Sequence, residues 1–399
     1  MTSPDKMPAV PCGEAAEFLL SVLREELTGE TFPMDEGMSE AVVSKMLTLA
    51  KRHDLGHLVA DYLLRYPLSE ELKSDCKTAK ASAQYRYFQQ TQVLSAVSKT
   101  FEKHGIDFIP LKGSVLRGLY PAPWMRSCSD IDILVHEEDI SRALELAETE
   151  IGMKRGFHGS HDYMLRYMEK VTVELHFRLL EDDAVNGASR ILEDCWDHTT
   201  SDSHCKQMTD EMFYLYHICH MAKHFEYGGC GIRFFMDLWL LDHKTTFDRE
   251  KRDALLQKAG LLGFAGKARE ISEKWFSGTE TEGTEHIERF IVQSGSFGRM
   301  SKNVSIGKHK KGGAFGYVKS RVFVPYDYLC ILYPSLKKHR ALTPVYEVVR
   351  WFRFIKPGSR AHTLAELNHL MKDSDTDAIT VLKDMGLLYD GSVYYRFNN

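Results

Sequence analysis

Asp130-Ile131-Asp132-Ile133-Leu134-Val135 is the stretch of sequence that decides the fold. Acidic and apolar residues alternate at its start, which is typical of a strand with one buried face. Because alternate residues of a strand point to the same face, Asp130 and Asp132 are expected to project together. Two carboxylates on one face repel each other, and a divalent cation with a preference for oxygen ligands removes that penalty. The stretch therefore predicts a strand that carries a metal site.

Two further segments extend this constellation. Val171 to Phe177 alternates again and predicts a second strand, on which Glu174 adds a third carboxylate if the two strands are neighbours. Residues 108–111, with the sequence FIPL, predict a short strand that enters a turn at Gly113, and residues 115–120 predict a short helix. Three carboxylates can hold two metal ions about 4 Å apart and clamp both oxygens of a phosphoryl displacement.

The turn between the first strand and the short helix has the composition of a phosphate site. Gly113 permits close approach of the backbone to a phosphate, and Ser114 adds a hydroxyl donor. Successive backbone N–H groups at a turn before a helix attract anions. Lys112 or Arg126 could neutralise charge on a triphosphate. This turn is therefore the predicted nucleotide-binding element.

Helical periodicity dominates on both sides of these strands. Residues 69–104 predict a long helix that ends at Gly105, and residues 138–151 predict an amphipathic helix that ends at Gly152. A short hairpin is expected near residues 389–391. The chain is therefore expected to have an α+β fold, with a small mixed sheet and its helices flanked by mostly helical regions. The expected regions are an N-terminal helical region (1–84), a core with the strands (85–200), a helical domain (201–300), a basic Gly-rich loop (301–321) and an aromatic-rich helical region (322–399).

Composition places the chain among ordinary globular proteins. Its 399 residues, 43% hydrophobic and 27% charged, suffice for two or three packed units. The net charge of 51 − 56 = −5 does not favour nucleic acid as a partner, although it leaves this open. The eight cysteines include no CxxC pair, which argues against a zinc ribbon. With no signal-peptide layout at the N-terminus and no long apolar run, we expect a cytoplasmic protein without a membrane partner.

The motifs, taken in order, resemble the polymerase-beta-like nucleotidyltransferase superfamily, whose signature is Gly-Ser, then Asp-x-Asp with apolar flanks, then a lone acid in a strand. More closely, the chain resembles the uncharacterised bacterial nucleotidyltransferase family, which reads LKG, a proline-bearing segment with an arginine, DIDxLV and VELH. The resemblance covers roughly residues 40–245 and, more weakly, the aromatic segment after 322. The matching segments are Leu111-Lys112-Gly113, Pro121 to Arg126, Asp130 to Val135, Val173 to His176, and the helical stretches His217 to His224 and Ile232 to Leu238.

The resemblance implies an αβαβ core with a mixed sheet, Mg²⁺ (or Mn²⁺), a nucleoside triphosphate donor and release of pyrophosphate, with ATP as the default donor. By motif matching, Asp130 and Asp132 would ligate metal, and Glu174 would be the third acid and the general base. Two departures stand out. Fifteen residues separate Ser114 from Asp130, more than in the compact superfamily pattern. Lys112 stands where the general pattern prefers an apolar residue, and this fits the closer family.

The acceptor is an unknown small molecule or macromolecule, and antibiotic, protein side chain and tRNA all remain open. His217, His220 and His224 recur on one helical face. We expect this face to shape the acceptor pocket, and a zinc site is the less favoured alternative. The other residues expected at this pocket are His176, Arg233 and Asp237.

Two further points stay open. The basic segment 302–321 is expected to be a mobile, solvated loop, and contact with phosphates or nucleic acid is the alternative.

The same fold could also serve as a non-catalytic nucleotide-binding module, in a toxin–antitoxin or signalling pair. A metal-dependent phosphohydrolase that uses the same carboxylates is the other rival of the transferase hypothesis.

Overall fold

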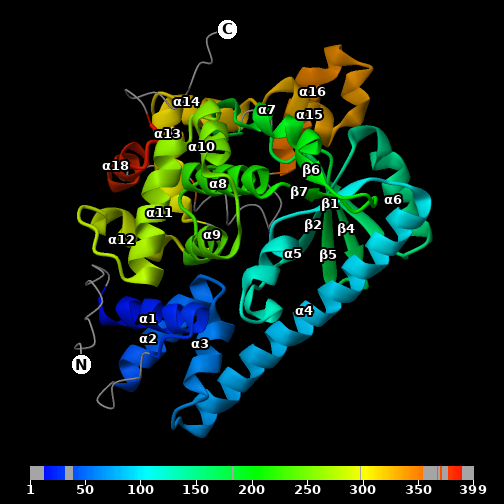
Figure 1. The fold of residues 1–399 in the computed structure, drawn as a ribbon. Helices are drawn as coiled ribbons and strands as arrows, with labels where there is room; N and C mark the ends of the chain where they lie inside the picture. The colour runs from blue at the N-terminus through cyan, green and yellow to red at the C-terminus, as the bar shows by residue number, and fades with distance from the viewer. Residues whose placement is uncertain are drawn as a thin grey trace.

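A five-stranded sheet forms the centre of one half of the molecule, and helices form the rest (Figure 1). The strand order is β1-β2-β5-β4-β3, in which β2 and β5 are parallel and the other neighbours antiparallel. This confirms the α+β class and three expected strands; β3 and β4 were not predicted. The strands are β1 (Phe108–Pro110), β2 (Asp130–Val135), β3 (Lys154–His158), β4 (Asp162–Tyr167), β5 (Val171–His176) and a separate pair, β6 (Thr199–Thr200) and β7 (Gln207–Met208).

The computed structural model describes most of the chain. The hairpin expected near residues 389–391 lies outside the described residues. The described residues are 13–31, 39–181, 184–296, 298–353, 366, 369–370 and 376–388.

The two faces of the sheet differ in polarity, as the alternation in the sequence requires. Ile131, Val173 and Leu165 lie on one face and belong to a buried core with residues of α4 (Glu70–His104) and α6 (Ile140–Thr149). The opposite face carries the acidic residues of β2 and β5. The sheet is therefore anchored on one side by helices and leaves its other side for a site.

The long helix α4 has 35 residues and runs along the sheet (Figure 1). Ser69 caps its first turn by accepting a hydrogen bond from the Leu72 N–H at 3.4 Å. Gly105 ends it with φ 66°, a left-handed conformation that glycine adopts without steric cost. Both ends therefore lie where the sequence predicts them.

A second core joins the N-terminal helices to the helices that follow the sheet. Leu19 and Leu58 from the N-terminal helices belong to the same buried cluster as Phe225 and Phe235. Regions far apart in the sequence thus share one core. Its helices include α1 (Glu14–Thr28), α2 (Glu40–Arg52), α3 (Gly56–Leu63), α5 (Gly113–Leu116), α7 (Ser189–Leu192), α8 (Asp210–Glu226), α9 (Ile232–Lys244), α10 (Arg249–Lys258), α11 (Leu262–Ser277) and α12 (Glu285–Ser294).

The basic segment 301–321, expected to be a loop, is largely helical. It forms most of α13 (Met300–Lys310) and α14 (Ala314–Val322), separated by a turn at Gly312 and Gly313, which have φ 71° and 110°. The high lysine content misled the prediction, because lysine stems can be buried along apolar surface. Lys302, for example, is only 5% exposed and donates to the Phe290 carbonyl at 2.9 Å.

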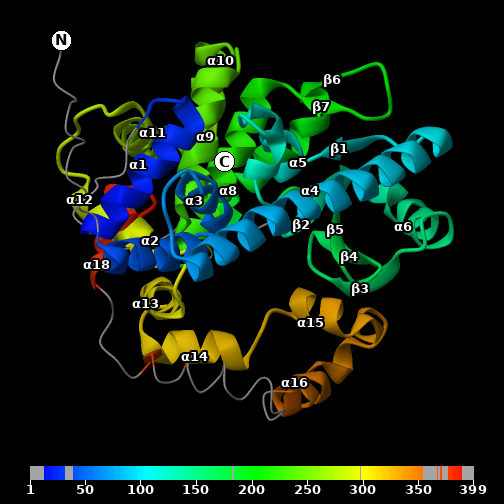
Figure 2. The same cartoon turned by 90° about the horizontal axis from the view of Figure 1, so that it is seen from below.

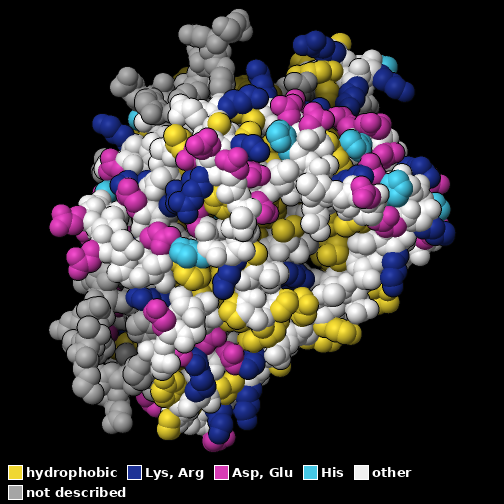
Figure 3. Space-filling model, in the orientation of Figure 1, with side chains coloured by type: hydrophobic (Ala, Val, Ile, Leu, Met, Phe, Trp, Pro, Cys, Tyr) yellow, Lys and Arg dark blue, Asp and Glu magenta, His cyan; other side chains and the backbone are white. Residues whose placement is uncertain are grey.

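The C-terminal helices after α13 extend as an arm beside the sheet (Figure 2). They comprise α14, α15 (Tyr326–Leu332), α16 (Thr343–Arg353) and short 3-10 turns, with a small core around Leu329 and Leu336. Helix α18 (Thr376–Asp384) returns to the main core. Within the described parts of the chain, none of the helices has the length and apolar content that a membrane span needs. On the face shown in Figure 3, acidic and basic side chains are interspersed.

Candidate active site

The register of β2 and β5 brings the three predicted carboxylates to one face of the sheet. Asp132 lies directly opposite Glu174 in the parallel pair, and Asp130 precedes Asp132 by two residues on the same face. The Asp132 side chain is 3% exposed and the Glu174 side chain 24% exposed. The two strands are thus neighbours, as expected, and Asp130 and Glu174 are partly exposed while Asp132 is buried.

Asp132 is held by two cationic or potentially cationic groups. Its Oδ1 accepts a hydrogen bond from Lys112 Nζ at 2.6 Å and another from His176 Nε2 at 3.0 Å. The same His176 nitrogen lies 3.6 Å from Glu174 Oε2. Burial alone would raise the pKa of Asp132, but Lys112 and His176 together hold it well below its usual range. Asp132 is therefore ionised.

Asp130 is less fully compensated, although Lys112 and a hydrogen bond from Ser129 favour its charged form. Burial, together with repulsion from Asp132 and Glu174, raises its pKa to about 6. The site thus carries excess negative charge that a cation would relieve. Within the described chain, one group of possible metal ligands has all its ligand atoms within 4.8 Å of one another: Asp132, Glu174 and His176. The donor set is mainly oxygen, which fits a hard divalent cation.

The turn that precedes α5 is tight and strained. The Ser114 N–H donates to the Leu111 carbonyl at 3.0 Å, and Lys112 adopts φ 43°, ψ −117°, a conformation that usually requires glycine. A β-carbon at Gly113 would lie 2.0 Å from Cys128 Sγ. Close packing on Cys128 is therefore a sufficient reason for this glycine. The strained turn aims Lys112 at Asp132.

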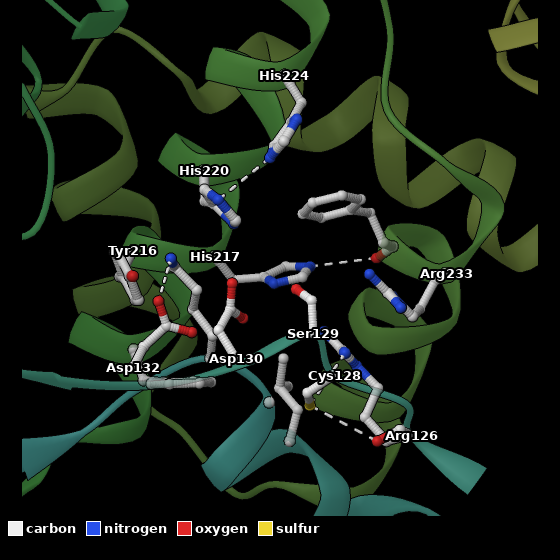
Figure 4. Close-up of a pocket in the computed structure, with 15 residues that line it drawn as sticks. Arg126, Cys128, Ser129, Asp130, Asp132, Tyr216, His217, His220, His224 and Arg233 are labelled. Carbon is white, nitrogen blue, oxygen red and sulfur yellow. Dashed lines mark hydrogen bonds and ion pairs between the residues drawn. The ribbon is translucent and has the colours of Figure 1, made fainter. Parts of the chain in front are cut away.

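A cavity of about 150 Å³ opens beside these acids (Figure 4). The strands and the α5 turn supply one wall, and α8 and α9 supply the other. The predicted residues Ser114, Glu174, His176 and Asp237 are absent from its lining. The lining consists of Lys112, Gly113, Leu116, Arg126, Cys128, Ser129, Asp130, Asp132, Phe213, Tyr216, His217, His220, His224, Arg233 and Phe234.

Two arginines of the lining are each fixed by a carboxylate outside it. Arg126 Nε donates to the two oxygens of Asp237, at 2.8 and 3.0 Å. Arg233 Nη1 donates to Asp54 Oδ2 at 2.8 Å, and both guanidinium groups also donate to the Ser127 carbonyl. Within the described residues, Nη2 of neither arginine has a hydrogen-bond partner. Both therefore retain donors that a ligand could use.

Asp237 has a different place from the one expected of it. It is fully buried, and besides Arg126 it accepts a hydrogen bond from the Tyr120 hydroxyl at 2.7 Å. A carboxylate so enclosed cannot reach an acceptor in the cavity. The sequence placed Asp237 on the correct helix, but only the tertiary contacts show that it orients Arg126.

The α8 histidines line the cavity as uncharged side chains. His217 Nε2 donates to the Phe234 carbonyl at 3.1 Å, and the Nε2 atoms of His220 and His224 lie 3.2 Å apart. Burial lowers the pKa of all three, that of His224 to about 3. Because His217 Nε2 is hydrogen-bonded to a carbonyl, the three rings do not converge on a metal ion. The zinc alternative therefore lacks support in the described chain.

Three buried polar atoms at this site have no hydrogen-bond partner in the described chain: Ser114 Oγ, His176 Nδ1 and the Tyr216 hydroxyl. Buried polar groups are rarely left unpaired, and such exceptions point to a missing ligand, ion or water. Tyr216 was not predicted from the sequence. It stands four residues before His220 on α8, and this helical spacing was the available signal.

A family model described as "Uncharacterised nucleotidyltransferase" matches residues 39–277, more than half of the chain. The chain belongs to this family. The match contains the sheet, the acids and the α8–α9 wall of the cavity, and it confirms the resemblance inferred from the motifs. No curated protein and no solved structure matches the chain. The family is a nucleotidyltransferase family by name, and the name specifies no donor, acceptor or metal.

Proposed function

We propose that this nucleotidyltransferase transfers a nucleoside monophosphate from a nucleoside triphosphate to a hydroxyl or amine of an acceptor. One observation carries the proposal. The β2–β5 register sets Asp132 against Glu174, with Asp130 on the same face, at the edge of a cavity whose other polar residues are mostly basic or histidine. A carboxylate cluster beside a basic pocket suits a metal-bound polyphosphate.

Asp130, Asp132 and Glu174 would hold Mg²⁺ or Mn²⁺, with His176 at the same cluster. A divalent cation supplies Lewis-acid stabilisation of the charge that develops on the transferred phosphoryl group and the leaving pyrophosphate. The raised pKa of Asp130 and the partnerless His176 Nδ1 support the fit of a cation here.

The triphosphate occupies the basic side of the cavity. Lys112, Arg126 and Arg233 line it, and both arginines have Nη2 donors available to phosphoryl oxygens. The Ser114 hydroxyl lacks a partner in the described chain but lies outside the cavity lining, so its contact with a phosphate would require a change in the α5 turn. Because Asp237 and Asp54 already orient the two arginines, the guanidinium groups can stabilise the leaving pyrophosphate without reorganisation. ATP is the first donor to test.

Glu174 is the candidate general base. Its side chain is 24% exposed, against 3% for Asp132, and it stands on the strand beside Asp132. In this role it accepts the proton of the acceptor hydroxyl or amine as the bond to phosphorus forms. His217, His220 and His224, held neutral by burial, provide a wall of hydrogen-bonding groups toward the acceptor.

Binding and turnover of each common labelled nucleoside triphosphate, with and without Mg²⁺, test the proposal. The comparison is between wild type, Asp130→Asn/Asp132→Asn, and the control Asp107→Asn, whose carboxylate pairs with His204 away from the site. We expect Mg²⁺-dependent binding and pyrophosphate release in wild type and control, and neither in the double variant.

Other outcomes would replace the proposal. Release of inorganic phosphate without an acceptor would favour a phosphohydrolase. Metal-dependent binding that yields no pyrophosphate with any acceptor class would favour a non-catalytic module. Absence of metal-dependent nucleotide binding in wild type would refute the assignment altogether.

A further inference from the structure

Tyr216 is a buried tyrosine whose hydroxyl has nothing to bond to in the described chain. Its side chain is 1% exposed and its hydroxyl oxygen has no hydrogen-bond partner there. The residue nevertheless lines the cavity, and Figure 4 shows it beside Asp132. Phenylalanine would fill the same space without a buried unpaired donor. The hydroxyl therefore calls for an explanation outside the packing of the chain.

The other fully buried tyrosine of α8 shows the ordinary arrangement. Tyr214, two residues earlier on another face of the helix, donates its hydroxyl to Asp242 Oδ2 at 3.4 Å. The guanidinium of Arg252 lies over its ring, with Cζ 5.1 Å from the ring centroid. Helix α8 thus carries one satisfied tyrosine in its core and one unsatisfied tyrosine at the cavity.

The surroundings of Tyr216 define the chemistry of its partner. Burial raises the pKa of the phenol well above its usual value, so the hydroxyl keeps its proton and can donate. The cavity it lines also contains the ammonium of Lys112 and the guanidinium groups of Arg126 and Arg233. The charged groups that act on the hydroxyl itself are Lys112 and the carboxylates Asp130, Asp132 and Glu174. A metal ion held by these carboxylates would bring a phosphoryl oxygen beside the hydroxyl, and such an oxygen is an acceptor that the cationic side chains of the cavity also attract.

We propose that the Tyr216 hydroxyl donates a hydrogen bond to a phosphoryl oxygen of the bound nucleoside triphosphate. This inference rests on the proposed function and adds a substrate-binding residue to it. The Tyr216 hydroxyl on α8 would then close on the phosphates from the wall opposite the α5 turn, together with the cationic side chains that line the cavity.

Tyr216→Phe tests the inference, with Tyr214→Phe as the matched control on the same helix. The probe is the Mg²⁺ complex of a non-hydrolysable analogue of the nucleotide that wild type binds. Dissociation constants and thermal unfolding midpoints are measured for all three proteins. For Tyr216→Phe we expect an unliganded midpoint equal to or above that of wild type, and nucleotide affinity weaker by about 10- to 100-fold.

Tyr214→Phe should behave in the opposite way, with a lower unliganded midpoint and unchanged nucleotide affinity, since it loses a bond within the core. Equal affinity in Tyr216→Phe and wild type would overturn the inference and leave the proposed function standing, with a water molecule as the partner of the hydroxyl. If wild type shows no Mg²⁺-dependent binding of any nucleotide, the proposed function fails and the inference fails with it.

Discussion

Asp237 and Asp54 each hold an arginine of the cavity, and they differ sharply in burial. Asp237 is fully buried and its oxygens accept hydrogen bonds from Arg126. The Asp54 side chain, which pairs with Arg233, is 45% exposed. Removing one partner of a buried ion pair typically costs about 3–5 kcal/mol, because the other charge stays buried without compensation. An exposed pair contributes about 1 kcal/mol or less.

Asp237→Asn and Asp54→Asn are therefore matched perturbations with different expected costs. The asparagine keeps the shape of the side chain and removes the charge, so Arg126 would remain buried beside a neutral amide. We expect the free energy of unfolding to fall by about 3–5 kcal/mol in Asp237→Asn and by at most about 1 kcal/mol in Asp54→Asn. Guanidinium chloride unfolding, followed by circular dichroism, measures both.

The same pair of variants separates the two interpretations of Asp237. If Asp237 contacted the acceptor, its substitution would weaken acceptor binding and leave stability near that of wild type. Equal unfolding free energies in Asp237→Asn and Asp54→Asn would refute the reasoning from burial. A large loss restricted to Asp237→Asn would confirm that this carboxylate orients Arg126 from behind the cavity.

Two other predictions follow from packing and protonation. Gly113→Ala places a β-carbon 2.0 Å from Cys128 Sγ, so we expect the free energy of unfolding, measured by chemical denaturation, to fall by about 1–3 kcal/mol. Adding Cys128→Ala should largely restore it, and additive losses in the double variant would contradict this explanation. His53 has its pKa lowered from 6.5 to about 4 by burial, so the unfolded chain takes up a proton before the folded chain does. Stability should then be complete above pH 6.5 and fall toward pH 4, by at most about 1.4 kcal/mol per pH unit for this residue. An acid titration of unfolding free energy with the same slope in wild type and His53→Asn would argue against it.

Local sequence patterns predicted the helices and strands that have a strong hydrophobic periodicity or a clear capping residue. Strand β2 has the predicted bounds, Asp130–Val135, because polar and apolar residues alternate over one buried face. Strand β3 escaped prediction because Lys154–His158 is mostly exposed and carries no apolar alternation. Its place at the edge of the sheet is set by pairing with β4. The hydrophobic periodicity of a single segment carries no information about such pairing.

The site divides in the same way between local and tertiary information. The acids were recognisable because their spacing along two strands fixes a common face. Tyr216 was not recognised, and Asp237 was named with a different role, because the roles of both residues depend on partners distant in the sequence. Asp237, for example, pairs with Arg126, 111 residues away. An unpaired hydroxyl is a property of the folded environment, and a single sequence contains no direct sign of it.

The network around the arginines explains how a small cavity could bind a highly charged ligand. Asp237 and Asp54 neutralise part of each guanidinium group and fix its direction before any ligand arrives. The Nη2 donors have no hydrogen-bond partner among the described residues, and little side-chain entropy is lost when an anion binds to side chains that are already fixed. Across the cavity, Lys112 offsets only part of the charge of Asp130 and Asp132. The acidic wall therefore requires a cation while the basic wall requires an anion, and a metal-bound triphosphate satisfies both at once.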